Sequence, residues 1–122
     1  MGSDRNFLCV EPVADASLDA VEARLTEGDV FDLWSDQRND TLVVAGYGGG
    51  HEPAAEKLRA VGDDVQRAFL LHVYDTTMSS DGWVYERTAD GLAELEQISG
   101  EGRYGIGVVD YVKREYDIDG PR

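Results

Sequence analysis

The chain has 122 residues, enough for one domain with its own hydrophobic core, and 42% of them are hydrophobic, which argues against wholesale disorder. It carries 25 acidic and 11 basic side chains, for a net charge of −14, and it has no basic stripe of the kind that binds a phosphate backbone. No apolar run approaches the roughly 20 residues that span a bilayer. The N-terminus has neither a basic segment nor a long apolar one, so no signal peptide is expected and a cytoplasmic location is predicted.

The first half of the chain predicts the order strand, helix, strand, strand, helix. Ser17 is a typical N-cap for a helix that runs to about Glu27 and stops at Gly28. Pro12 ends the strand before that helix, and Pro53 stands at the tolerated first turn of the second helix. A polar turn, DQRND, separates the second strand from the third. The predicted ranges are 6–13, 17–27, 29–35, 41–47 and 53–61.

The second half begins with RAFLLHVYDT at 67–76, the most apolar strand pattern in the chain. The loop TMSSDG joins it to a strand at 82–87, which predicts a hairpin. Residues 88–99 place Leu92, Leu95 and Ile98 at helical spacing, so a helix is predicted there in spite of Gly91. Residues 105–117 fit a helix better than a strand, and residues 118–122 are expected to be a frayed tail.

This element order indicates one α+β domain over residues 1–122. It begins with the ferredoxin-like order βαββαβ, in which two helices cover one face of an antiparallel sheet. A C-terminal hairpin strand and one or two C-terminal helices would complete the domain.

A glycine-rich segment between the third strand and the second helix is the first candidate site. Gly48, Gly49 and Gly50 leave their backbone amides unobstructed ahead of a helix start, where anions bind, and His51 offers a proton or a hydrogen bond. The spacing matches no nucleotide-binding fingerprint, and Glu52 would oppose a phosphate. The pattern therefore favours a plain turn, with an anion or nucleotide site as the alternative.

Metal and catalytic patterns are weak. His51 and His72 are the only histidines, too far apart in sequence to indicate a transition-metal site, and no cofactor fingerprint is present. Ser79 and Ser80 lack the G-x-S-x-G context of an activated nucleophile. Cys9 is the only cysteine and lies in an apolar strand, which indicates a small buried hydrophobe. The sequence predicts no metal and no cofactor, and it favours a non-enzymatic domain.

The strand at 67–76 is apolar on both of its faces. His72 and Tyr74 share one face with each other, and Trp83 and Tyr85 on the next strand can meet them. Trp34 would extend this aromatic patch into an interface or a pocket. Because two helices cover only one face of a sheet, the other face needs a cover. The C-terminal helices are the favoured cover, and dimerisation or a ligand are the alternatives.

The composition also indicates a habitat. Two lysines stand against nine arginines, aspartate outnumbers glutamate fifteen to ten, and the acids are spread evenly along the chain. This composition resembles that of cytoplasmic proteins from halophilic archaea that accumulate salt. The leading hypothesis is a small binding or regulatory domain that associates with a protein partner or with itself. The alternative is a protein, either an enzyme or a binding protein, that holds a small molecule, anion or nucleotide with the Gly48–His51 loop and the aromatic face.

Overall fold

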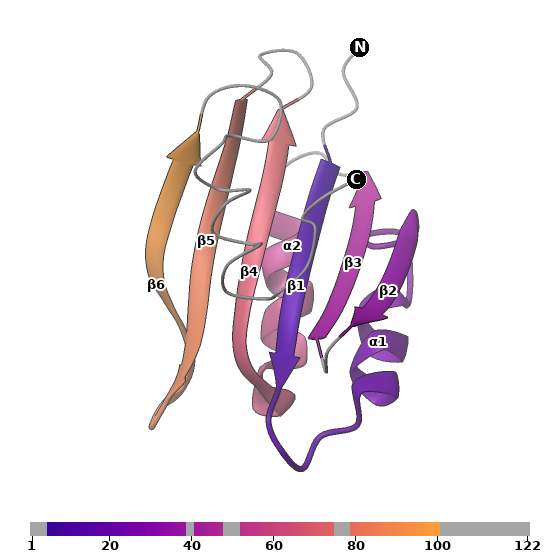
Figure 1. Cartoon of the computed structure of the whole chain (residues 1–122), viewed down its shortest axis with the longest axis vertical. Helices are drawn as coiled ribbons and strands as arrows, with labels where there is room; N and C mark the ends of the chain where they lie inside the picture. Colours follow the sequence, from indigo (N-terminus) through magenta and orange to yellow (C-terminus); the bar gives the residue numbers. More distant parts are fainter. Residues whose placement is uncertain (1–4, 39–40, 48–51, 75–78, 101–122) are drawn as a thin grey trace.

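Figure 1 shows one antiparallel sheet with two helices on the same face. The computed structural model describes residues 5–38, 41–47, 52–74 and 79–100. In chain order the elements are β1 (Arg5–Pro12), α1 (Leu18–Thr26), β2 (Trp34–Arg38), β3 (Thr41–Tyr47), α2 (Glu52–Ala60), the 3-10 helix η1 (Gly62–Asp64), β4 (Val65–Tyr74), β5 (Ser79–Thr88) and β6 (Gly91–Gly100). The predicted α+β class is confirmed.

The six strands lie in the order β2-β3-β1-β4-β5-β6, and each strand is antiparallel to its neighbours. β1 is therefore an interior strand between β3 and β4, which explains its almost continuous apolar sequence. β2 and β6 form the two edges of this sheet (Figure 1). The order of the complete sheet differs from that of the four-stranded ferredoxin-like fold, because two further strands follow β4.

The elements with strong local signals form where the sequence predicts them. The backbone amide of Ala20 donates to the Ser17 hydroxyl at 3.3 Å, so Ser17 is the N-cap of α1. α2 places Ala54, Ala55 and Leu58 on its buried side. The predicted hairpin is also confirmed, because β4 and β5 pair along their length.

The strand predicted over 29–35 is wrong in its position, since β2 begins only at Trp34. Residues 29–33 instead bring the chain from α1 back to the sheet edge, where the Leu33 amide donates to the Ala45 carbonyl at 3.0 Å. Phe31 in this crossing segment is buried in the core. The apolar residues that suggested a strand therefore belong to a connection that contributes Phe31 to the core and leaves Leu33 exposed.

Three residues of the expected turn, Asp36, Gln37 and Arg38, are part of β2 instead, and the other two lie outside the described residues. The Ser35 hydroxyl donates to Glu22 at 2.7 Å, and the Gln37 amide donates to Asp19 at 2.8 Å. Both acceptors lie on α1. These bonds attach the helix to an edge strand that has little apolar surface of its own.

The helix predicted over 88–99 is wrong, because this segment is the strand β6. Thr88 pairs with Gly91 across a two-residue turn, and Gly91 has a φ of 116°, a conformation that favours glycine. The Thr88 hydroxyl also donates to the Gly91 carbonyl at 2.8 Å. Pairing of β6 with β5 along its whole length outweighs the intrinsic helix preference of its Leu, Ala, Glu and Gln residues.

Three further predictions lie outside the described residues. They are the turn or anion site at Gly48–His51, the helix at 105–117 and the frayed tail at 118–122.

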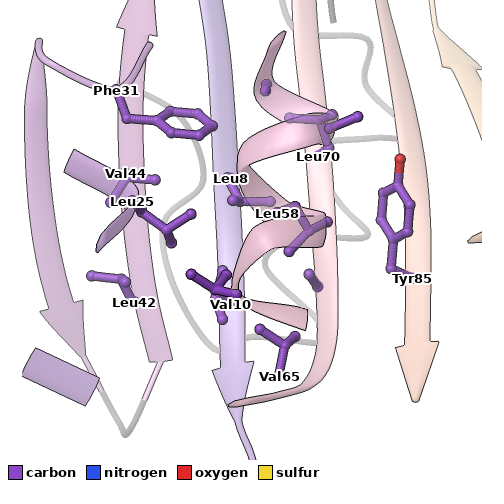
Figure 2. Close-up of a cluster of buried hydrophobic side chains, with 14 of the residues drawn as sticks. Leu8, Val10, Leu25, Phe31, Leu42, Val44, Leu58, Val65, Leu70 and Tyr85 are labelled. Atoms are coloured by element: carbon purple, nitrogen blue, oxygen red, sulfur yellow. The ribbon is translucent and has the colours of Figure 1, made fainter. Parts of the chain in front are cut away.

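The main core lies between the sheet and the two helices (Figure 2). Leu8, Val44 and Leu70 extend from three neighbouring strands toward Leu25 of α1 and Leu58 of α2. All five side chains are fully buried. Burial of one leucine side chain contributes roughly 1.5–3 kcal/mol, so this layer supplies a large share of the apolar burial that stabilises the fold.

Candidate functional site

Two residues of the predicted aromatic patch, Trp83 and Tyr85, lie on the face of the sheet that the helices cover. Trp83 is directly opposite Leu70 in the pairing of β4 and β5, and Tyr85 is opposite Ala68. Both aromatic side chains are buried in the helix-side core. Burial raises the pKa of Tyr85 to about 12, and the nearby Glu94 carboxylate adds to this shift. In this structure the two side chains are core residues.

His72 belongs to a row of residues that crosses four strands near one end of the sheet. In register, this row contains Gly46, Asn6, His72 and Asp81, from β3, β1, β4 and β5. The His72 Nδ1 lies 2.8 Å from the Asn6 Oδ1, and both side chains are fully buried. Because an amide oxygen only accepts, this contact places the imidazole proton on Nδ1. The pair fixes the orientation and the tautomer of His72 inside the protein.

The remaining predicted site residues are separated from this row or lie beyond the described part. Trp34 stands in the register row of Ala45 and Phe7, one residue out of step with the row of Trp83. Tyr74 ends β4, paired with Ser79. Gly48, Gly49, Gly50 and His51 are outside the described residues. Among the predicted residues, the register of β4 and β5 places His72, Trp83 and Tyr85 on the same face of the sheet.

The sheet face opposite the helices is also buried. We call it the second face, and its core residues are Phe7, Cys9, Val43, Ala45, Phe69, Leu71 and Val84. None of them belongs to the helix-side cluster. Burial raises the pKa of the Cys9 thiol to about 12, which makes this cysteine unreactive. The sequence correctly predicts an apolar second face.

Gly82 shows how tightly the second face is packed. A methyl group at Gly82 would come within 2.4 Å of the Phe69 ring, which lies over this glycine. The ring of Phe69 is 0% exposed, although both described helices lie on the other side of the sheet. The second face is therefore closely packed and belongs to the protein interior.

The outer edge of β6 is exposed in the described sheet. β6 pairs with β5 and has no strand on its other side among the described residues. Its central residues Glu94, Leu95, Glu96 and Gln97 are all exposed, and Leu95 is 56% exposed. The register skips Leu95, because Val84 pairs with Glu96 and Tyr85 with Glu94, so a bulge lies at Leu95 itself. Backbone amides and carbonyls along such an edge are available to another strand.

Within the described residues there is no group of three or more His, Cys, Asp or Glu side chains arranged to hold a metal ion. Nor do those residues contain a helix of the length and apolarity that crossing a membrane requires. Comparisons with protein-family models, curated proteins and solved structures found no match.

Proposed function

We propose that this protein is a small cytoplasmic binding domain of a salt-accumulating organism, and that it associates with another protein strand through the outer edge of β6. The observation that carries the proposal is the ten-residue strand β6, whose outer edge has no partner in the described sheet. Strand addition uses the backbone hydrogen-bonding groups of such an edge for affinity and the neighbouring side chains for specificity. The occupant that we test is a second copy of the chain.

The two edges of the sheet differ in a way that favours β6. β2 has five residues, and its Ser35 and Gln37 side chains are bonded to acids on α1. β6 has twice that length and exposes Leu95 at its centre. A long edge with an exposed apolar side chain is the better template for pairing.

The charges of β6 connect the association to salt. Glu94 and Glu96 are exposed on this strand, so two copies of the edge repel each other in dilute buffer. At molar ionic strength the Debye length falls to about 3 Å and the repulsion is largely screened. The acidic edge therefore permits pairing in concentrated salt and opposes it in dilute buffer.

The arrangement of the other strands supports a ferredoxin-like origin. The first four strands lie in the order β2-β3-β1-β4, and both helices cover the same face. In this interpretation β5 and β6 are an extension of the unit, and the extension supplies the edge that binds. The alternative of a small-molecule site stays a prediction, since the Gly48–His51 loop is outside the described residues and His72 is fully buried.

Hydrogen exchange of the β6 amides tests the proposal. In molar KCl, the exchange of these amides in the wild type should slow as protein concentration rises, because a second copy covers the edge. Leu95→Asp should remove this concentration dependence. Leu33→Asp is the matched control, since Leu33 is the other large hydrophobic residue exposed in the described part, at 39%, and lies away from β6. Exchange of β6 that is independent of concentration in the wild type would contradict self-association at this edge.

A further inference from the structure

The bulge at Leu95 changes how β6 presents its outer edge. Opposite residues of an antiparallel pair alternate between those that exchange backbone hydrogen bonds and those whose N–H and C=O groups point away from each other. The two-residue turn after Thr88 requires Thr88 and Gly91 to be a hydrogen-bonded pair. Because β5 pairs with β4 in unbroken register, the alternation along β5 is regular. Every second residue of β5, counted back from Thr88, therefore directs its backbone groups toward β6.

This alternation identifies the residues of β6 whose backbone groups face outward, at the edge of the sheet in Figure 1. They are the partners of the intervening β5 residues, namely Leu92, Glu94, Gln97 and Ser99. Neighbours in this set are two positions apart, except that Glu94 and Gln97 are three apart because Leu95 is the extra residue of the bulge. A regular strand repeats its outward groups at every second residue, so it cannot pair with both halves of this edge.

The interrupted spacing is complementary to itself. When two β6 strands run antiparallel about a two-fold axis between positions 95 and 96, Leu92 faces Ser99 of the second copy, and Glu94 faces Gln97 of the second copy. The interruption in one copy then lies opposite the interruption in the other. We propose that the bulge at Leu95 sets this register and makes a second copy of the chain the preferred partner of β6. This inference rests on the association through β6 that is proposed above.

The exposed side chains at the centre also fit this register. Glu94 and Gln97 are opposite Tyr85 and Trp83 on β5, so both lie on the helix side of the sheet. The two-fold axis is perpendicular to the sheet, and the helix sides of the two copies are therefore continuous. Each Glu94 faces an amide, which can donate to a carboxylate, and the register avoids an acid directly opposite the same acid. The carboxylates of the two copies still lie near one another, so the contact keeps its dependence on salt.

Cysteine cross-linking tests the register. Glu94→Cys and Gln97→Cys are prepared as separate variants of the full chain, since both positions are exposed and the native Cys9 is buried. When the two variants are mixed in molar KCl and oxidised, position 94 of one chain should link to position 97 of the other, because Cα atoms of such a pair lie about 5.5 Å apart. Either variant alone should give no link. Its own position in the second copy lies three residues along the strand, roughly 10 Å away, which exceeds the reach of a disulfide.

Deletion of Leu95 tests the role of the bulge. The deletion restores the two-residue spacing, so a deletion chain matches a second deletion chain but only half of a bulged edge. Deletion chains that carry Glu94→Cys and Gln97→Cys should link to each other, and the yield should fall strongly when one of them is mixed with a bulged partner. Leu95→Ala is the control, because it keeps the extra residue and should leave the link intact. A deletion chain that links to a bulged chain as readily as to its own kind would overturn the proposal.

Sedimentation of the same proteins separates the register from association itself. A wild type that dimerises in molar KCl, together with cysteine variants that link only when mixed, supports the register. Dimers in which either variant links to its own kind, or in which the mixture gives no link, would overturn the register and leave the association in place. A wild type that stays a monomer contradicts the proposed association, and the register falls with it.

Discussion

At the scale of single residues, Gly46 fixes how closely the chain crosses the sheet after α1. A methyl group at Gly46 would lie 1.9 Å from the Val30 carbonyl oxygen and 2.9 Å from the Phe31 Cα. These are backbone atoms, which cannot rotate away as the end of a side chain can. The same crossing buries Phe31 in the helix-side core. A glycine is therefore required at position 46 because the segment 29–33 passes directly against it.

Gly46→Ala should destabilise the fold by about 3 kcal/mol or more, at the upper end of overpacking effects, because residues 30 and 31 must shift. Gly62→Ala is the matched control. Its new methyl group would lie 3.6 Å from the Leu92 Cβ, an ordinary contact, and should cost no more than about 1 kcal/mol. Urea denaturation in molar KCl measures both variants. A Gly46→Ala variant as stable as the wild type would contradict the described path of residues 29–33.

Cys9 makes stability depend on pH in the alkaline range. The thiol has a pKa of 9.0 in an exposed chain and about 12 in the folded protein, because burial disfavours the thiolate. The folded state thus holds this proton more tightly than the unfolded state. Its contribution to stability is complete below pH 9 and is lost as the pH rises toward 12.

Cys9→Ala should therefore weaken the decline of stability above pH 9, although loss of the sulfur also lowers stability at neutral pH. Tyr85, whose pKa rises from 10.0 to about 12, keeps a decline of its own in both proteins above pH 10. Urea midpoints between pH 7 and pH 10 measure the difference, which should be clearest just above pH 9. If the urea midpoints of the variant and of the wild type fall by the same amount above pH 9, the titration of Cys9 does not contribute to the decline, which would contradict this prediction.

At the scale of the elements, local signals were sufficient where one residue determines a boundary. The Ser17 cap starts α1, and Pro12 ends β1. Continuous apolar sequence identifies β1 and β4, because interior strands are buried on both faces. Each of these signals acts within a few residues, so no knowledge of the rest of the fold is needed to recognise it.

β6 and β2 could not be placed in this way, because their partners decide their structure. Leu92, Leu95 and Ile98 fit a helical face as well as positions on a strand, and pairing with β5 decides between the two. Ser35 and Gln37 are in a strand because they pair with β3, and α1 supplies acceptors for their side chains. The structure of β6 depends on strand pairing that competes with a local preference for helix. The structure of β2 depends on contacts with segments that are distant in the sequence.

The candidate sites show the same limit. The sequence identifies His72 as a notable residue, but its partner Asn6 is 66 positions away and becomes apparent only from the register of β1 and β4. The aromatic pair Trp83 and Tyr85 is correctly placed on the face of His72. That this face is the one covered by the helices depends on the packing of α1 and α2, which the alternation of residues does not determine. The sequence does not predict the exposed edge at Leu95, because it predicts a helix over the residues that form β6.

At the scale of the whole molecule, charge and sheet architecture act together. A net charge of −14 on 122 residues produces self-repulsion that salt screens. The sheet has apolar layers on both faces and leaves the long edge of β6 uncovered in the described part. In our account, concentrated salt therefore favours both the folded chain and its association through that edge.

The most direct test of this account is sedimentation of the wild-type protein over a range of protein concentrations, at KCl concentrations from dilute buffer to the molar range. We predict a monomer in dilute buffer and a dimer in molar KCl, because screening removes the repulsion between the acidic β6 edges. A protein that remains a monomer at all salt concentrations, or that associates most strongly in dilute buffer, would contradict the proposal that β6 mediates salt-dependent self-association.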